Sequence, residues 1–235
     1  AYQRKKMFNS LIKNYPFYSD VANQDLNFLS SGIAAFSKWP IEKKADVKYK
    51  SCEKEECLAS KGALYIKINK LGEFYHFFAT HLQSEKTDDS YQTRENQLET
   101  LRDFILEQNI PDNEPVILAG DFNIDTYDNR LKFFKNNSVP ISEIDYTLQY
   151  LNVRKSPHVG YKYSYDYYAN KMTALNKSNQ GMRLALDHIW IMNNQAIVSN
   201  SLEWYQDLKS THPDLVNAPD TSDHFPVMSE IAFAN

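Results

Sequence analysis

The chain has 235 residues, a length that can form one complete hydrophobic core and does not require two domains. Its hydrophobic content of 42% and charged content of 24% are ordinary for a globular protein, and no apolar run approaches the ~18 residues that a membrane-spanning helix needs. The formal net charge of −4 argues against a protein that tracks nucleic acid through a basic face.

In the first third of the chain, four segments show the pattern of regular structure: a helix that ends at Pro16 and strands at 32–36, 63–69 and 73–80. In the helix, Met7, Leu11 and Phe8 are expected to face inward. Gly72 lies between the last two strands, and we therefore expect them to form a hairpin.

The rest of the chain alternates predicted elements with polar segments. Residues 91–108 are expected to form a helix, because Leu98, Leu101 and Ile105 fall on one stripe. Three further strands are predicted, at 115–119, 184–192 and 226–233. Three segments are expected to be mixed or irregular: 125–151, 159–179 and 193–221.

The two cysteines, Cys52 and Cys57, are too few for a zinc site, and no histidine lies at suitable spacing nearby. A secreted protein would join them in a short-loop disulfide, whereas a cytosolic protein would keep two thiols. The pattern slightly favours the disulfide.

Four polar motifs lie at the ends of predicted strands, where loops usually build sites. His81 follows the strand 73–80, and Asp121 and Asn123 follow the strand that ends at residue 119. Asp187 opens another strand, and His224 comes just before the last one. Each motif alone has an ordinary structural interpretation, such as an Asp/Asn turn or a capped strand end, so the functional interpretation depends on their combination.

Together these side chains suit the attack of water on a phosphodiester with the help of a metal ion. Asp121 and Asn123 offer oxygen ligands for a hard cation. A neutral His224 can accept the proton of the attacking water, and Asp187 can fix its tautomer. His81 can donate a hydrogen bond to a phosphoryl oxygen as negative charge develops there.

These motifs resemble, in kind and in order, those of the endonuclease/exonuclease/phosphatase superfamily. They are His81 in Ala-Thr-His-Leu-Gln, Asp121 and Asn123 in Gly-Asp-Phe-Asn, Asp187 in Leu-Asp-His-Ile, and His224 in Ser-Asp-His-Phe-Pro. Within the superfamily the chain is most similar to the neutral, bacterial-type sphingomyelinases C. The pointers are a Ser-Lys-Gly step that runs into a strand, at 60–62, and Thr-His-Leu-Gln-Ser-Glu, at 80–85.

The resemblance implies an α/β fold of the DNase I-like kind, a four-layer α/β sandwich in which two mixed β-sheets pack face to face with helices outside. It implies one such domain over residues 1–235. It also implies Mg2+-dependent hydrolysis of sphingomyelin, or a related phospholipid at a membrane surface, to ceramide and phosphocholine. A secreted monomer that does not bind nucleic acid is expected.

Three further residues acquire expected roles only through the resemblance. Lys61 would lie near the substrate, paired with Glu56 five positions upstream. The alternative is an exposed ion pair that contributes little. Asp223 would contact a second cation, in addition to the metal at Asp121 and Asn123.

The chain departs from the superfamily pattern at two places. The principal metal-ligand glutamate, which normally lies on an early strand, has no counterpart, and we expect the chain to be N-terminally incomplete. Secreted sphingomyelinases also carry an aromatic hairpin before the Ser-Asp-His motif, where this chain has only Trp204 and Tyr205. Its tyrosines cluster elsewhere, at 161, 163, 165, 167 and 168. This cluster either contacts lipid headgroups or is an ordinary Tyr-rich loop near the site.

Two other functions stay open on sequence grounds. The same catalytic set would serve a nuclease like DNase I or a phosphoinositide phosphatase, because the chemistry at phosphorus is shared. A catalytically inactive binding module is the second alternative, and the missing glutamate is its best support.

Overall fold

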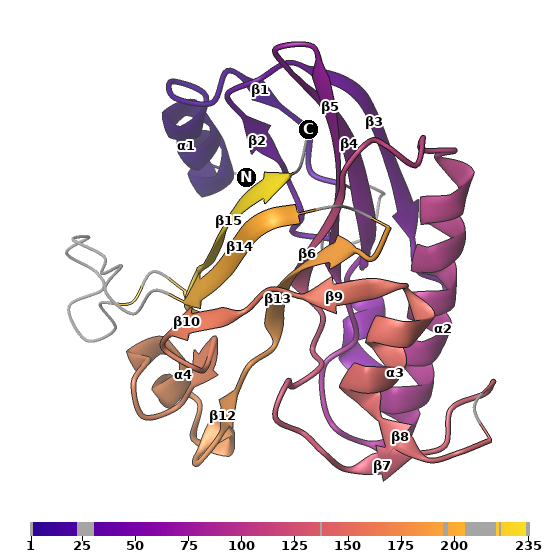
Figure 1. Cartoon of the computed structure of the whole chain (residues 1–235). Helices are drawn as coiled ribbons and strands as arrows, with labels where there is room; N and C mark the ends of the chain where they lie inside the picture. Colours follow the sequence, from indigo (N-terminus) through magenta and orange to yellow (C-terminus); the bar gives the residue numbers. More distant parts are fainter. Residues whose placement is uncertain are drawn as a thin grey trace.

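The computed structural model describes residues 2–22, 31–136, 138–194, 197–204, 220 and 222–233. A six-stranded mixed sheet forms its centre (Figure 1). In spatial order its strands are β3 (Ile41–Lys48), β4 (Gly62–Lys70), β5 (Glu73–His81), β6 (Val116–Asp121), β13 (Asp187–Met192) and β9 (Val153–Lys155). Strands β5 and β6 run parallel, while their outer neighbours pair antiparallel.

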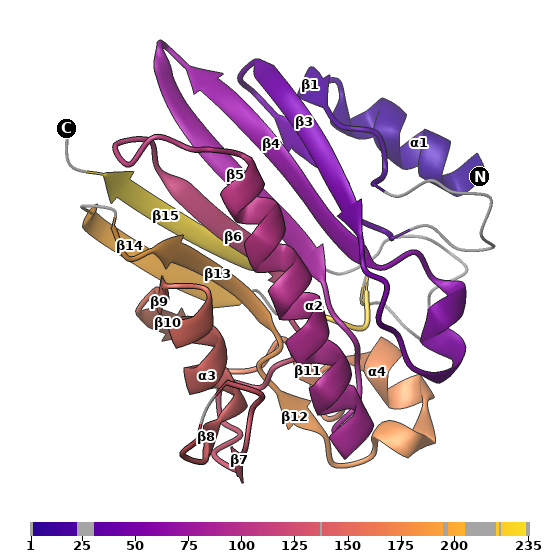
Figure 2. The same ribbon diagram turned by 90° about the vertical axis from the view of Figure 1, so that its right-hand side faces the viewer.

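Two helices cover the outer face of this sheet, α2 (Asp88–Glu107) and α3 (Glu143–Tyr150) (Figure 2). Alternate side chains of the strands point toward them, since successive residues of a strand face opposite sides. Phe78, Leu118 and Trp190 therefore join Leu98 and Leu101 in the main hydrophobic core. This burial is the largest stabilising contribution to the fold and holds the strand ends in fixed positions.

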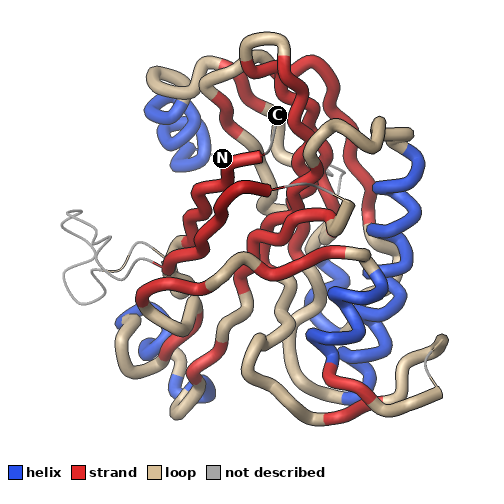
Figure 3. The backbone as a smooth tube through the Cα atoms, in the orientation of Figure 1, coloured by secondary structure: helices blue, strands red, loops and turns tan. Residues whose placement is uncertain are grey.

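A second, smaller mixed sheet faces the inner side of the first. Its strands are β10 (His158–Gly160), β14 (Ile197–Trp204) and β15 (Val227–Phe233), in that order. Val227 of β15 packs with Ile189 of β13 over the buried Ala185. Figure 3 shows the strands in the middle of the molecule and the helices on the outside. Two mixed sheets packed face to face with helices outside are the architecture that the sequence predicted.

The remaining elements are short. They are the helices α1 (Tyr2–Leu11) and α4 (Lys171–Leu175), the 3-10 turns η1 (Lys54–Leu58) and η2 (Lys177–Asn179), and the paired strands β1 (Phe17–Tyr18) with β2 (Phe36–Ser37), β7 (Leu131–Lys132) with β8 (Ile141–Ser142), and β11 (Tyr165–Asp166) with β12 (Arg183–Leu184). None of the helices in the described part of the chain has the length and hydropathy needed to cross a bilayer.

The predicted hairpin, the helix 91–108 and the strands 115–119 and 226–233 are confirmed within a few residues. The helix α2 begins three residues earlier than predicted because the side chain of Thr87 accepts a hydrogen bond from the Ser90 N–H and caps it. The predicted strand 184–192 is interrupted, since β12 ends at Leu184 and β13 begins at Asp187.

Other expectations were wrong. The predicted strand 32–36 is reduced to the two residues of β2, and Met7 is 52% exposed instead of facing inward. The opening helix ends at Leu11, before Pro16, and its Phe8 packs against Phe36 with ring centroids 4.8 Å apart. Strand β3 was missed because its residues are mostly charged, as is common in an edge strand. Residues 197–204, expected to be irregular, form β14.

Candidate active site

Strand register places three of the predicted site residues in one row across the six-stranded sheet. His81 at the end of β5 pairs with Asp121 at the end of β6, and Asp121 pairs with Asp187 at the start of β13. Paired residues on neighbouring strands point to the same face, which here is the inner face. The row therefore presents an imidazole and two carboxylates to the space beside the second sheet.

Gly120 allows this row to form. Its φ is +144°, and a Cβ added at this position would lie 2.0 Å from the carbonyl oxygen of Thr80 on β5. Only glycine fits this close backbone approach. The turn that follows is closed by the N–H of Asn123, which donates to Asp121 Oδ1 at 2.9 Å. The side-chain amide of Asn123 donates to the carbonyl of Leu82 at 3.0 Å and ties this turn to the end of β5.

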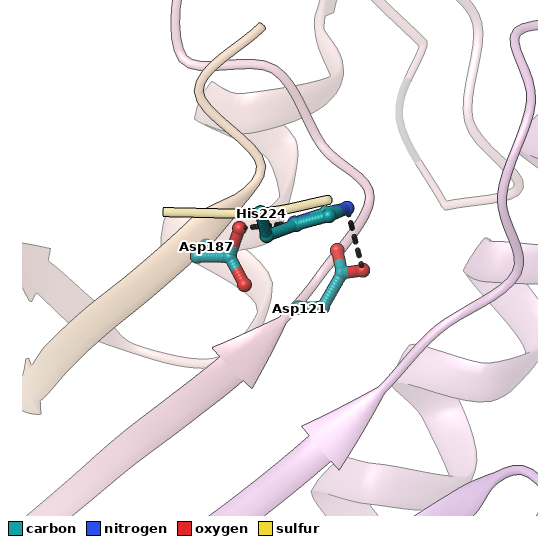
Figure 4. A group of neighbouring side chains, drawn as sticks. All are labelled: Asp121, Asp187 and His224. Atoms are coloured by element: carbon teal, nitrogen blue, oxygen red, sulfur yellow. Dashed lines mark hydrogen bonds and ion pairs between the residues drawn. The ribbon is translucent and has the colours of Figure 1, made fainter. Parts of the chain in front are cut away.

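His224 reaches the row from the loop before β15 (Figure 4). Its Nδ1–H donates to Asp187 Oδ2 at 2.6 Å, and its Nε2 lies 4.0 Å from Asp121 Oδ2. His81 Nε2 lies 3.5 Å from the same Asp121 oxygen. The structure thus brings together His81, Asp121, Asp187 and His224, which the sequence had selected from four separate motifs.

The environment changes the protonation of these groups in opposite directions. Burial and the nearby charge of Asp187 raise the pKa of Asp121 to about 7. Burial alone would lower the pKa of His224, but the hydrogen bond and charge of Asp187 and the charge of Asp121 raise it to about 9. Burial and the positive charge of Lys61 lower the pKa of His81 to about 4. The site therefore combines His81, which is neutral at neutral pH, with His224, which readily binds a proton.

The donor set suits a hard divalent cation. One ligand atom each from Asp121, Asp187 and His224 lie within 4.8 Å of one another. Asp187 Oδ2 already accepts from His224, whereas Asp121 Oδ2 accepts no hydrogen bond within the described residues. A cation at Asp121 would favour the ionised form that burial now disfavours, so the carboxylate and the neighbouring Asn123 fit such an ion.

Lys61 and Glu56 form an ion pair close enough to the row for the charge of Lys61 to act on His81 and Asp121. The Lys61 side chain is buried, its Nζ lies 2.7 Å from Glu56 Oε2, and it donates to the Leu82 carbonyl at 2.6 Å. Glu56 in turn accepts from the backbone N–H of Ser84 at 3.1 Å. The alternative of an exposed pair is therefore wrong for the lysine. The pair fixes the loop after β5, and Glu56 lies inside the loop that the Cys52–Cys57 disulfide closes.

Asp223 is not part of the carboxylate and histidine group. Its exposed side chain accepts from Ser222 Oγ at 3.3 Å. It does line a cavity of about 970 Å3 that opens over the row. Other walls of this cavity come from the loop 84–87, from Tyr165, and from residues 176–186.

Ser164 makes contacts that sequence reasoning missed. Its buried Oγ accepts the N–H groups of Leu186 and Asp187 at 3.0 and 3.1 Å, and its carbonyl accepts the N–H of Phe225 at 2.7 Å. One residue thus joins the strand that carries Asp187 to the loop that carries His224. A serine inside a Tyr-rich segment gives no local signal of such long-range contacts.

The remaining histidines, to which no role was assigned, have structural partners where the structure describes them. His76 lies between Tyr65 and Glu114, and His188 Nε2–H donates to the Ile124 carbonyl at 2.7 Å. His158 Nε2–H donates to the carbonyl of Tyr161. His212 lies outside the described residues, as does Tyr205.

Comparison with known proteins gives a consistent result. A family model described as Endonuclease/Exonuclease/phosphatase family matches residues 4–224. Sphingomyelinase C 2 of Leptospira interrogans is 28% identical in an alignment of 211 residues that covers 82% of this chain and 32% of the relative. Sphingomyelinase C of Bacillus cereus is 32% identical in an alignment of 191 residues that covers 73% of this chain and 55% of the relative. The chain thus spans between a third and about half of the length of these relatives.

Among solved structures, beta toxin from Staphylococcus aureus, as an F277A, P278A mutant with bound magnesium ions, has a TM-score of 0.81 and 24% identity. The match covers 98% of this chain and 82% of that chain. At this identity the likeness establishes the fold, and it agrees with the DNase I-like sandwich predicted from the sequence.

Proposed function

Because the chain belongs to the endonuclease/exonuclease/phosphatase family, we propose that it is a phosphodiesterase that depends on a divalent cation, with Mg2+ the preferred ion. The observation that carries the proposal is the row His81–Asp121–Asp187 with His224 hydrogen-bonded at its end. The named activity of the similar proteins supports sphingomyelin as the substrate, with ceramide and phosphocholine as the products.

In this mechanism His224 is the general base. Asp187 accepts its Nδ1–H, so the neutral imidazole presents an unprotonated Nε2 toward Asp121. That nitrogen takes a proton from water as the water oxygen bonds to phosphorus, the bond from phosphorus to the ceramide oxygen breaks, and the ceramide alkoxide is protonated by solvent. Asp187 holds the ring and stabilises the imidazolium that forms.

His81 has a different role. Its lowered pKa keeps it neutral, and a neutral imidazole can donate one hydrogen bond to a nonbridging phosphoryl oxygen. The charge of the buried Lys61 acts on His81 and supports the negative charge of a phosphate bound at the row. Lys61 and Glu56 thereby serve substrate binding indirectly, by fixing the loop after β5.

Asp121 and Asn123 would hold the cation, and Asp223 remains our candidate for a second one at the cavity wall. When bound, the cation supplies positive charge that stabilises the ionised carboxylates, lowers the pKa of His224 and withdraws charge from the phosphate. We also propose a single-domain, secreted monomer, and the Cys52–Cys57 disulfide supports an oxidising compartment.

The test is release of phosphocholine from sphingomyelin vesicles by the full natural protein, with Mg2+ and with EDTA. We expect hydrolysis that EDTA abolishes, and a kcat for His224→Ala that is roughly 10²–10⁴-fold lower. His158→Ala is the matched control, because His158 does not line the cavity. Equal rates for His224→Ala and the parent would refute the assignment. Plasmid nicking without phosphocholine release would favour a nuclease, and no hydrolysis of either by folded protein would favour a binding module.

A further inference from the structure

The segment 161–184, next to the cavity, has a charge pattern unlike that of the whole chain. Its exposed charged side chains are all basic, and they are Lys162, Lys171, Lys177 and Arg183. Its one acidic residue, Asp166, is fully buried and accepts from Arg183 Nε at 2.8 Å. Exposed Asp223 and Glu85 also line the cavity, but within a protein of net charge −4 this segment itself carries four exposed basic side chains and no exposed acidic one.

The same segment exposes large apolar side chains. Tyr168 is 70% exposed, Leu175 67% and Met182 41%. Met182 lines the cavity, and Leu175 directly precedes the cavity residue Asn176. Exposed aromatic and aliphatic groups gathered with basic groups are typical of a surface that meets a lipid headgroup region.

Hydrogen bonds connect this segment firmly to the loop that carries His224. Asn170 Nδ2 donates to the Ser222 carbonyl at 2.9 Å, and Thr173 Oγ1 donates to the Asp223 carbonyl at 2.5 Å. If the protein docks on a partner through this segment, the mouth of the cavity is held in a fixed position relative to that partner.

The placement of the segment in the fold agrees with such a role. Figures 1 and 2 both show α4 and β12 at the lower end of the molecule, and Figure 2 shows β11 beside them. The site row lies at the same end, because His81 ends β5 and Asp187 begins β13. The turn between β4 and β5, which contains Leu71, lies at the opposite end.

We propose that residues 161–184 form the surface by which this protein docks on a phospholipid bilayer, with Tyr168 and Leu175 entering the headgroup region and the basic side chains contacting lipid phosphates. The proposal deepens the proposed function and rests on it for the choice of a lipid partner. Nucleic acid fits less well, because exposed aliphatic side chains such as Leu175 and Met182 gain nothing from a sugar-phosphate backbone.

The experiment measures binding to vesicles of sphingomyelin and phosphatidylcholine, with and without phosphatidylserine, by flotation in EDTA so that hydrolysis is not needed. Leu175→Asn is expected to weaken binding about tenfold, the effect of losing most of the burial of one leucine. Leu71→Asn is the matched control, since Leu71 is 83% exposed in the distant turn and is expected to change nothing. Lys177→Gln is expected to weaken binding about fivefold on the vesicles with phosphatidylserine.

A second readout separates this proposal from the proposed function. Hydrolysis of a water-soluble phosphocholine ester with Mg2+ is expected to be equal for Leu175→Asn and the parent, because Leu175 does not line the cavity. Vesicle binding that depends on Leu175, without hydrolysis of the phosphocholine ester, would support docking and refute the proposed sphingomyelinase activity. Docking is overturned if the parent does not bind vesicles, or if Leu175→Asn binds them as tightly as Leu71→Asn. Binding of the same variants to an oligonucleotide is measured in parallel. Docking on lipid is also overturned if Lys177→Gln weakens binding to the oligonucleotide but not to the vesicles with phosphatidylserine.

Discussion

Gly120→Ala tests whether the close approach of β5 and β6 builds the site. The alanine Cβ would lie 2.0 Å from the Thr80 carbonyl oxygen, at a φ of +144°. A non-glycine residue in a positive-φ conformation of this kind costs about 2 kcal/mol. Relief of the clash, which requires the two strands to separate, costs about 2 kcal/mol more. We therefore expect Gly120→Ala to destabilise the fold by about 4 kcal/mol in total.

The control is Gly72→Ala in the β4–β5 turn, where φ is +97° and a Cβ would meet nothing within 4 Å. This variant has the conformational cost alone, about 2 kcal/mol. Because 1 kcal/mol corresponds to roughly 2–4 °C at this chain length, calorimetry should show Tm falls of roughly 8–16 °C for Gly120→Ala and 4–8 °C for Gly72→Ala.

The two variants should also differ in activity below their melting temperatures. Separation of the strands at Gly120 moves the adjacent Asp121 away from His81 and His224, whereas a change at Gly72 leaves the row intact. Equal falls in Tm for the two alanine variants would refute the reasoning, since the clash with Thr80 would then have no energetic consequence.

Three further outcomes follow from buried polar contacts. In steady-state kinetics, Ser164→Ala should lower kcat about tenfold and leave KM unchanged, because the lost hydrogen bond from the Asp187 N–H is worth ~1.4 kcal/mol in holding Asp187 in place. Ser164→Thr, which keeps the hydroxyl, should restore kcat. An unchanged kcat for Ser164→Ala would contradict this role. Arg94→Met should cost about 3–5 kcal/mol in urea unfolding, because it leaves the buried Glu143 unpaired, and adding Glu143→Leu should recover part of the loss; a single variant as stable as the double variant would contradict the role of the pair. Burial lowers the pKa of His188 from 6.5 to about 4. Between these two pH values the unfolded chain binds more protons than the folded chain, so up to ~3 kcal/mol of the free energy of unfolding is lost as pH falls from 6.5 to about 4. His188→Gln should show a shallower loss by urea unfolding across the same pH range, and an equal slope would contradict the assignment.

Local patterns were sufficient for the elements with strong periodicity. The hairpin β4–β5 followed from alternating apolar residues around Gly72, and α2 followed from its stripe of Leu98, Leu101 and Ile105. Strands β3 and β14 could not be predicted in the same way. Strand β3 is mostly charged, and β14 interrupts its apolar residues with Ser199, Asn200 and Ser201, so neither shows a clear alternation; both become strands because neighbouring strands supply backbone partners.

The site shows the same division. Each motif stood at a strand end, so convergence of His81, Asp121, Asp187 and His224 could be expected from the sequence. The buried state of Lys61 could not, because it depends on the loop after β5 folding over the lysine and on Glu56 meeting it there.

By itself, the sequence determined which side chains are candidates for the chemistry and on which strand ends they stand, because residue type and strand alternation are local properties. Only the tertiary structure decided the distances among them. Register across β5, β6 and β13 aligned the row, and Ser164 joined Asp187 to the loop of His224 through contacts between residues far apart in the chain. Distances of this kind depend on how whole elements pack, and no window of the sequence contains that information.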